Sequence, residues 1–351
     1  MGGLIPHNRP LITAEDTAAV DAVLASGWIA QGPAVQALET SMVQQYRSGG
    51  AVAVSSGTAA LFLALKALGA VPGTTVAVPT YACSALLNAV FMAGAVARLV
   101  DVLPDTFCLD PDAVKSQAPD AGFVIAVHTF GAVAEVAALR GHGRIVIEDC
   151  CQSLGGMSGE EPLGAVGDAA VFSFYATKII TAGQGGLVWS RTVSEKVRDY
   201  RQFDGRESYD PRFNFQLTDL QAALANSQLE RLGHIRARRA AIAGAYLAGL
   251  PKGLETQRDP CAAGRMAQRF VVVAPDQATR DRLLAHMTAA GVGCIVPIAR
   301  FELLHRYLHL DPAAYPVAEQ LSATTLSLPL HLCLSDADVA VISDALKRFS
   351  A

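Results

Sequence analysis

The sequence lacks several features that would place it in other classes of protein. No run of 18 or more uninterrupted apolar residues occurs, so no membrane-spanning helix is expected. The N-terminal stretch MGGLIPHNRP has no apolar core of the kind that signal peptides carry. The seven cysteines are irregularly spaced and form no C-x-x-C pair, which is typical of proteins from a reducing compartment. These absences predict a cytoplasmic protein without a membrane partner.

Signals for nucleic acid, metal and dinucleotide binding are also scarce. The net charge is −4, and no basic stripe is present, so nucleic acid is not an expected partner. The eight histidines are scattered and form no H-E-x-x-H, so no metal site is expected, although the adjacent Cys150 and Cys151 leave a metal-binding or redox-active pair as an alternative. Neither G-x-G-x-x-G at the first helix nor G-x-x-x-x-G-K-[ST] occurs, which argues against a nicotinamide-dependent dehydrogenase.

What the sequence does contain is a regular alternation of short apolar segments with helical ones. The chain has 351 residues and is 51% hydrophobic, enough for a large core. Strands that are apolar throughout and separated by helices predict an α/β fold with a mostly parallel sheet covered on both faces. The expected strands are 51–54, 75–79, 96–100, 122–128, 144–149, 169–174 and 185–190, and the expected helices are 14–26, 35–46, 57–68, 82–93, 217–232 and 234–249.

The pattern changes after residue 250. Shorter strand and helix segments follow, which indicates a small C-terminal α/β domain. We therefore expect a large domain over 1–250, with an N-terminal arm over 1–12, and a small domain over 251–351. The segments that carry this expectation are 269–275, 280–291, 326–330 and 336–349.

One of only six lysines, Lys178, lies in an unusual setting, FSFYATKIITAGQGG (172–186). Aromatic and β-branched neighbours would remove water from its amine, whereas lysines are normally solvated. A partly buried amine can act as a nucleophile or form a Schiff base. The alternative is a lysine at a strand end whose amine reaches out to water.

Two other segments have the pattern of ligand sites. SSGTAAL (55–61) lies between a strand and a helix, where backbone amides and the helix N-terminus can bind an anion, or it is an ordinary turn. Asp149 ends a buried strand in IVIEDCCQSLGG (145–156), where open α/β sheets place ligands, or it caps the following turn. Gln152 can present an amide to the same ligand, and Ser173 adds a hydroxyl near Lys178.

Together these pieces match the needs of one cofactor, pyridoxal phosphate. It requires an amine for covalent attachment, an acid that keeps its ring nitrogen protonated, an anion cradle and a face on which its ring can stack. The candidates, in that order, are Lys178, Asp149, Gly57 with Thr58 and Ser173, and Tyr81.

The chain resembles the DegT/DnrJ/EryC1/StrS family of sugar aminotransferases, which have the type I aminotransferase fold. The resemblance implies that Lys178 binds pyridoxal phosphate, that Asp149 contacts its ring nitrogen, and that Gln152 contacts its ring hydroxyl. Gly57, Thr58 and Ser173 match the phosphate cradle, Tyr81 the stacking aromatic, and Asn214 a residue donated by the neighbouring subunit of a homodimer. The matching blocks include SGWIAQGP, SSGTAALFLALKALGA, VPTYACSALLNAV, VHTFG, IEDCCQSLG, GDAAVFSFYATK, GQGG, FNFQLTDLQAAL and LSLPLH.

The resemblance also implies a reaction. An amino group would pass from L-glutamate to a keto-sugar, a nucleotide-linked 4-keto-6-deoxy sugar being expected. Lysine at position 178 favours transamination, because dehydrating members resembling this chain carry histidine there. A keto-cyclitol or another ketone is the alternative acceptor, and a non-catalytic cofactor-binding sensor is the alternative class.

Positions nearer the substrate depart from the family pattern. Gln184 stands where Glu is frequent, Gln216 where Arg is frequent, and CIVPIAR (294–300) lacks the histidine of a Tyr-x-x-x-His element. The candidate substrate contacts are Trp28, Gln31, His128 and His331, although a histidine in such a setting is more often a hydrogen-bonded structural residue.

Overall fold

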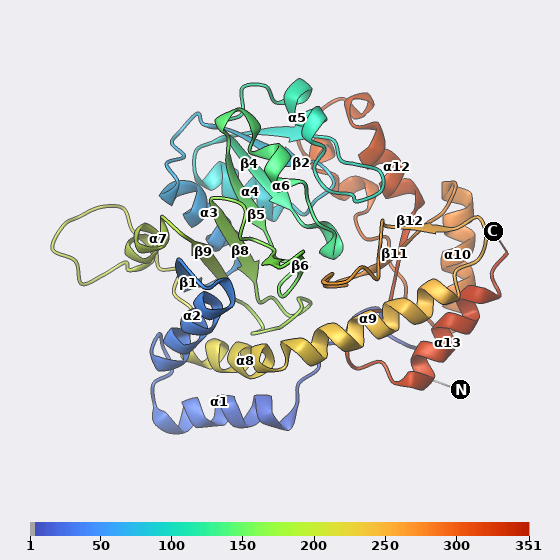
Figure 1. Cartoon of the computed structure of the whole chain (residues 1–351), viewed down its shortest axis with the longest axis horizontal. Coiled ribbons are helices and arrows are strands. Elements are labelled where there is room, and N and C mark those ends of the chain that lie inside the picture. Colours follow the sequence, from blue (N-terminus) through green and yellow to red (C-terminus); the bar gives the residue numbers. More distant parts are fainter. Residues whose placement is uncertain (1–3, 351) are drawn as a thin grey trace.

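A seven-stranded sheet forms the centre of the larger part of the molecule (Figure 1). The computed structural model describes residues 4–350, so the first three residues of the predicted arm lie outside it. Six of its strands point in one direction, and β9 runs antiparallel to both of its neighbours, β1 and β8. The predicted mostly parallel sheet is confirmed. Its order is β1 (Gly50–Val54), β9 (Gly186–Ser190), β8 (Ala169–Ser173), β5 (Ile145–Asp149), β4 (Phe123–Val127), β2 (Thr75–Pro79) and β3 (Val96–Val100).

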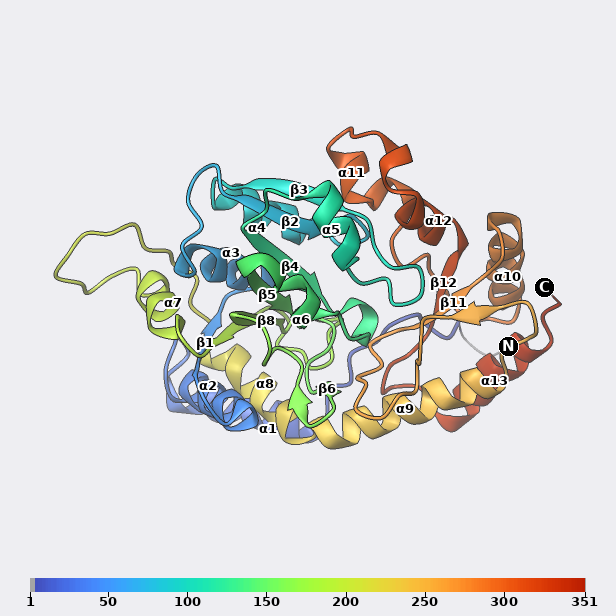
Figure 2. The ribbon, with the colours of Figure 1, turned by 45° about the horizontal axis from the view of Figure 1, so that its top comes forward.

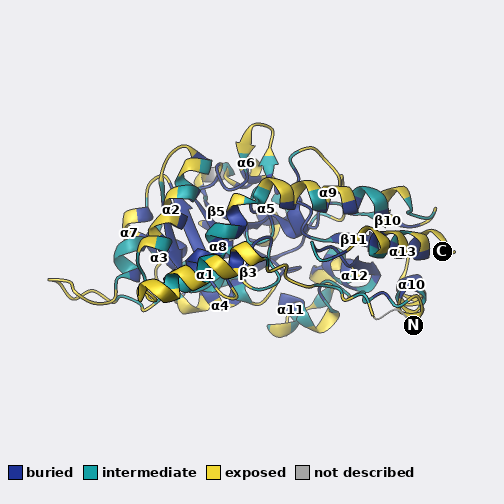
Figure 3. Ribbon diagram, turned by 90° about the horizontal axis from the view of Figure 1, so that it is seen from below, coloured by how far each residue is buried: buried dark blue, intermediate teal, exposed yellow. Residues whose placement is uncertain are grey.

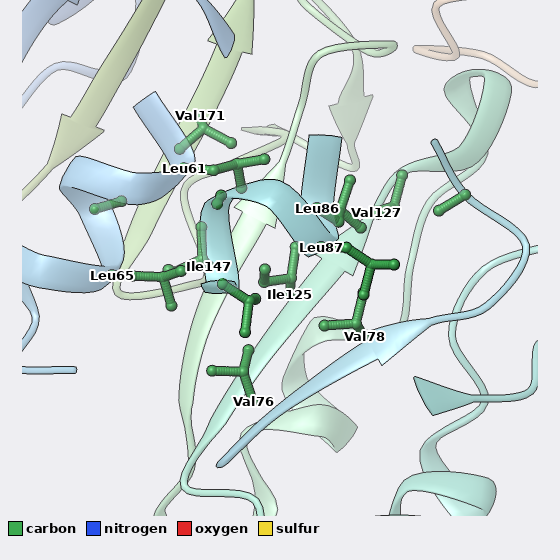
Figure 4. Packing of buried hydrophobic residues seen from close by; sticks show 14 of the residues in the cluster. Leu61, Leu65, Val76, Val78, Leu86, Leu87, Ile125, Val127, Ile147 and Val171 are labelled. Carbon is green, nitrogen blue, oxygen red and sulfur yellow. The ribbon is translucent and has the colours of Figure 1, made fainter. Parts of the chain in front are cut away.

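Helices cover both faces of this sheet, as its apolar strands require. On one face, α3 (Gly57–Ala67) and α4 (Ala85–Met92) pack on alternate strand residues such as Val76 and Ile147 (Figure 4). On the other, α2 (Pro33–Tyr46) and α8 (Asp219–Glu230) cover one half of the sheet, and α5 (Pro111–Gln117) and α6 (Val136–Leu139) cover the other half. Figure 3 shows the buried sheet between helices whose outer sides are exposed.

The helix boundaries follow from their end residues. In α1 (Ala14–Ser26), Thr13 and Asp16 form the predicted capping box, and the helix ends at Gly27, whose φ of 75° suits glycine. The Ser56 hydroxyl accepts from the Ala59 amide at the start of α3. The other helices are α7 (Ser194–Arg201), α9 (Leu232–Ala248), α10 (Gln277–Ala289), α11 (Leu304–Tyr307), α12 (Pro316–Thr324), α13 (Asp336–Lys347) and the short η1 (Thr129–Gly131), η2 (Gly141–Gly143), η3 (Arg300–Glu302) and η4 (Pro312–Ala314).

The long helix α9 leads from the large sheet to a second core (Figure 2). Its C-terminal half packs with α10, α13 and a three-stranded antiparallel sheet of β10 (Glu255–Thr256), β11 (Phe270–Val273) and β12 (Thr325–Leu328). A two-stranded sheet, β6 (Met157–Ser158) with β7 (Glu161–Pro162), lies outside both. The division into 1–250 and 251–351 stays a prediction, and Leu303, Leu304 and Leu321 pack in the core around the large sheet.

No helix within residues 4–350 is long and apolar enough to cross a bilayer.

Candidate active site

The candidate cofactor residues gather at one edge of the large sheet, where its parallel strands end. Asp149 is the last residue of β5, Ser173 is the last of β8, and Gly57 begins α3 just after β1. Because the carboxyl ends of parallel strands share an edge, residues far apart in the sequence meet there.

The anion cradle at the start of α3 leaves little room for side chains. The Ala59 amide is bound by the Ser56 hydroxyl, whereas the Gly57 and Thr58 amides have no acceptor among the described residues. A Cβ on Gly57 would lie 2.9 Å from the Cβ of Ser173 and 3.4 Å from the Sγ of Cys151. Glycine therefore keeps the amides accessible beside the Ser173 hydroxyl, as an anion site at a helix N-terminus requires.

Asp149 is buried, with 5% of its surface exposed. Its Oδ1 accepts from the Cys151 amide at 2.9 Å, and no other donor reaches the carboxylate within residues 4–350. A buried carboxylate with one hydrogen bond has acceptor capacity left for a ligand.

Lys178 is half-buried, and its charge acts on the same two thiols as the charge of Asp149. Loss of hydration in a crowded setting raises the pKa of the Cys83 and Cys151 thiols, although Cys83 still has exposed surface. Asp149 raises the pKa of both further, and Lys178 lowers both. One amine and one carboxylate therefore influence the same two thiols, so Lys178, Asp149, Cys83 and Cys151 lie in one region of the molecule, called the recess below.

Tyr81 is not placed to stack on a ligand. Its ring has no exposed surface, packs edge-on against Phe107 and Phe130, and bonds through its hydroxyl to Thr325 Oγ1 at 3.1 Å. Its neighbour two residues on, Cys83, is the exposed residue beside the lysine and the carboxylate. Tyr81 was predicted to stack on the cofactor because it is the aromatic residue of VPTYAC. In the structure it is part of the hydrophobic core.

Gln152 lies beyond Asp149 with its side chain already engaged. Its Oε1 accepts from the Phe130 amide at 2.8 Å, which orients the side chain and leaves its amide nitrogen as the free donor. An amide N–H can donate to a ring hydroxyl, so the predicted contact between Gln152 and the cofactor stays a prediction.

His128 has a structural role and does not contact the recess. It is fully buried, its Nδ1 accepts from the Ala134 amide at 3.1 Å, and its Nε2 bonds Glu148 at 2.9 Å. Both ring nitrogens are used, so the predicted substrate contact is wrong in this fold. The ligand atoms of His128, Glu148 and Cys150 lie within 4.8 Å of one another, but the Glu148 carboxylate also accepts three backbone amides, from Gly164, Val166 and Gly167.

The other predicted substrate residues do not lie together. His331 shares a cavity of about 340 Å³ with Lys178, which keeps it a candidate. Gln31 lines a different cavity with Glu39 and Arg201, and Trp28 is exposed in the turn before it. Neither Trp28 nor Gln31 lines the cavity that contains Lys178.

Asn214 is exposed on the segment between α7 and α8, which projects from the molecule in Figure 1. The adjacent Phe215 carbonyl accepts from the Ser55 amide, so this segment runs beside the anion cradle. Gln184 is exposed and Gln216 half-buried. In 294–300, Ile295 pairs with Ser327 on β12.

These residues fit pyridoxal phosphate. The open amides beside Ser173 suit a phosphate, the underused carboxylate of Asp149 suits a protonated ring nitrogen, and Lys178 supplies an amine at the same recess. Cys83 and Cys151, which the sequence prediction missed, lie in the same region.

Comparison with known proteins defines the class. The aminotransferase TlmJ from Streptoalloteichus hindustanus is 29% identical, with a TM-score of 0.90 over 98% of each chain. DesV from S. venezuelae, solved in complex with a ketimine intermediate, is 30% identical, with a TM-score of 0.88 over 98% of each chain. The putative sugar aminotransferase Spr1654 from Streptococcus pneumoniae, in its PLP form, has the same fold, with a TM-score of 0.89 at 24% identity over 98% of each chain.

The family model and these aminotransferase structures together define a pyridoxal-phosphate-dependent transaminase. The model of the DegT/DnrJ/EryC1/StrS aminotransferase family matches residues 10–347, and the chain belongs to that family.

Proposed function

We propose that this transaminase moves an amino group from L-glutamate to a keto-sugar, and that the sugar is a nucleotide-linked 4-keto-6-deoxy sugar. Family membership supports an amino transfer, and the site supports the chemistry. The observation that carries the proposal is geometric. Ser173 and Cys151 lie against Gly57 at the open amides of α3, and the Cys151 amide binds the Asp149 carboxylate. Lys178 follows on the turn after Ser173.

Each residue has a task. Lys178 holds the cofactor between turnovers, and its Nζ then takes a proton from the substrate carbon and returns one during the reverse half of the cycle. Asp149 keeps a proton on the ring nitrogen. When bound, pyridoxal phosphate supplies a ring that accepts the electron pair left on the substrate carbon. Gly57, Thr58 and Ser173 would hold the phosphate, Gln152 would donate to the ring hydroxyl, and Cys83 would lie on the side of the ring that was predicted for Tyr81.

A second copy of the chain completes the proposal. Asn214 is exposed and stands between Phe213 and Phe215, whose backbones bond to Tyr200 and Ser55. It belongs to the segment between α7 and α8, part of which reaches outwards in Figure 1. We propose a homodimer in which this asparagine donates to the phosphate bound by the partner.

An absorbance spectrum of the purified protein, before and after L-glutamate, tests the donor half of the reaction. We expect a visible band from the lysine-bound cofactor, and we expect glutamate to remove it as 2-oxoglutarate forms. A band that glutamate leaves unchanged would sink the choice of donor. No band after added pyridoxal phosphate would sink the role of Lys178.

Screening ketones against the aminated form then tests the acceptor. The departures at Gln216 and in 294–300 favour a keto-cyclitol or another ketone as the second candidate. Return of the visible band with a keto-sugar nucleotide supports the first candidate, and its return only with a keto-cyclitol supports the second.

A further inference from the structure

Asn214 lies at the tip of a small turn whose two sides are held by aromatic rings. The Phe215 amide donates to the Phe213 carbonyl at 2.8 Å, which closes a three-residue γ-turn with Asn214 at its apex. The two flanking rings stack with 5.5 Å between their centroids and 13° between their planes, and both residues are half-buried, whereas Asn214 is exposed. The turn therefore presents Asn214 outwards and keeps its two neighbours against the protein.

Both flanking rings pack on a single residue of α3, Phe62. The Phe62 ring meets the Phe213 ring edge-on at 4.8 Å and the Phe215 ring edge-on at 6.1 Å, measured between centroids. Edge-to-face pairs favour one relative orientation of the rings, because the edge of one ring is attracted to the face of the other. Phe62 is 4% exposed and belongs to the core around the large sheet, so its ring is a fixed support for the turn.

Lys66 supports the same turn from the next turn of α3. Its Nζ lies 5.0 Å from the centre of the Tyr200 ring on α7 and 6.0 Å from the centre of the Phe213 ring. The Phe213 amide also donates to the Tyr200 carbonyl at 2.8 Å. Residues four apart on a helix share a face, so Phe62 and Lys66 offer one surface of α3 to the turn.

The backbone joins this turn to the start of the anion cradle. The Ser55 amide donates to the Phe215 carbonyl at 2.8 Å, and Gln216 pairs with Val54 at the end of β1. Gly57 begins α3, and Phe62 lies on the second turn of the same helix. One helix therefore contributes its N-terminus to the cradle of its own chain and its side to the turn that presents Asn214.

We infer that Phe62 is a positioning residue for the cofactor site of the partner subunit. Through Phe213 and Phe215 it fixes the apex of the turn, so that Asn214 reaches the phosphate bound by the partner without the ordering cost of a mobile loop. This inference rests on the proposed homodimer and on the proposed contact between Asn214 and that phosphate. A purely structural Phe62 would instead support the cradle of its own chain, and the two roles differ in which site a substitution weakens.

Titration of the apoprotein with pyridoxal phosphate, followed by the visible band, tests the support. We expect Asn214→Ala and Phe62→Leu each to weaken binding at least threefold, and the double variant to bind no more weakly than Asn214→Ala, because one residue acts through the other. Pyridoxal, which lacks the phosphate, should bind Phe62→Leu and the wild type equally. Phe123→Leu is the matched control and should keep the wild-type affinity, because Phe123 is 7% exposed in the same core but begins β4, at the opposite edge of the sheet.

Mixed dimers show which of the two sites is weakened. When a wild-type chain is paired with a chain carrying Phe62→Leu and Lys178→Ala, only the wild-type lysine gives the visible band. We expect this site to bind pyridoxal phosphate at least threefold more weakly than the same site in a dimer of wild type with Lys178→Ala alone. When Phe62→Leu is paired with Lys178→Ala, the band reports the site on the Phe62→Leu chain, which should bind as in that reference dimer.

The opposite pattern, a weakened site on the Phe62→Leu chain and an unchanged site on its partner, overturns the inference. Wild-type affinity of Phe62→Leu beside weak binding by Asn214→Ala also overturns it and leaves the proposed contact of Asn214 intact. Wild-type affinity of Asn214→Ala, or a monomer on size-exclusion chromatography, refutes the proposed contact, and the inference falls with it. If Phe62→Leu fails to fold, Lys66→Met at the half-buried rim of the cluster replaces it in the same dimers, with the same expected pattern.

Discussion

Two neighbouring carboxylates on β5, Glu148 and Asp149, differ in almost everything except burial. Consecutive strand residues point to opposite faces of a sheet. Glu148 accepts three backbone amides and a hydrogen bond from His128. Asp149 accepts one amide, from Cys151, beside a lysine and two thiols. The first carboxylate has its hydrogen bonds satisfied, and the second has capacity left over.

The difference separates structure from chemistry. Burial alone would raise the pKa of Glu148, but its bonds to His128 and to the amides of Gly167 and Gly164 outweigh burial and hold the pKa below its usual value. Such a network stabilises the fold and leaves Glu148 without an acceptor atom for a ligand. A buried carboxylate that accepts too few hydrogen bonds lowers the stability of the fold. A cofactor that donates to it stabilises the folded protein when it binds.

The largest effect should come from Lys178→Ala. The variant removes the only amine placed to move the proton, so turnover should fall by about 10³-fold or more. Steady-state transamination with glutamate measures it, and a thermal melt should show an unchanged fold, because a half-buried lysine leaves no large hole. Appreciable remaining turnover would contradict the assignment.

Asp149→Asn should come next. Asparagine cannot hold a proton on the ring nitrogen by charge, so kcat should fall by roughly 10²–10³-fold. The free energy of unfolding should change little, because the asparagine oxygen can still accept from the Cys151 amide. Near-wild-type rates would refute the role of this carboxylate.

The contrast also explains what sequence could predict. The apolar strands predicted the sheet, which is confirmed, and strand ends such as Asp149 and Ser173 predicted where a site would form, because both expectations follow from periodicity and from the geometry of parallel sheets. The roles of Tyr81 and His128 could not be read in this way. Both lie in the right segments, but whether a side chain enters the core or the recess depends on packing with Phe107, Phe130 and Glu148, which no local pattern encodes.

Glu148→Gln should reverse the pattern of Asp149→Asn. The new NH₂ group would face the backbone donors, so the free energy of unfolding should fall by about 1–3 kcal/mol while the folded fraction keeps its kcat. Chemical denaturation measures the loss. Glu135→Gln is the matched control, because Glu135 is exposed nearby and should change nothing. A large loss of kcat without a loss of stability would mean that Glu148 serves the reaction.

The pH dependence of that stability difference is a smaller effect. The pKa of Glu148 is lowered from 4.5 in the folded protein, so its contribution is full above that value and is lost as the pH falls through the folded pKa. Wild type should therefore exceed Glu148→Gln by a constant amount from pH 5 to 8, and the gap should narrow in acid. A gap that widens in acid would contradict the sign of the shift.

The smallest expected effect is a change in the rate at which Cys83 is alkylated. If Cys83 lies against the cofactor ring, bound pyridoxal phosphate should slow its alkylation by iodoacetamide several-fold relative to the apoprotein, as measured by mass spectrometry of the labelled peptide. Cys261, which is exposed elsewhere, should label equally in both forms and serves as the internal control. Cys150, on the side of β5 that carries the Glu148 network and fully buried, should resist labelling in both. Equal labelling of Cys83 with and without the cofactor would place the ring elsewhere and reopen the question of what replaces Tyr81.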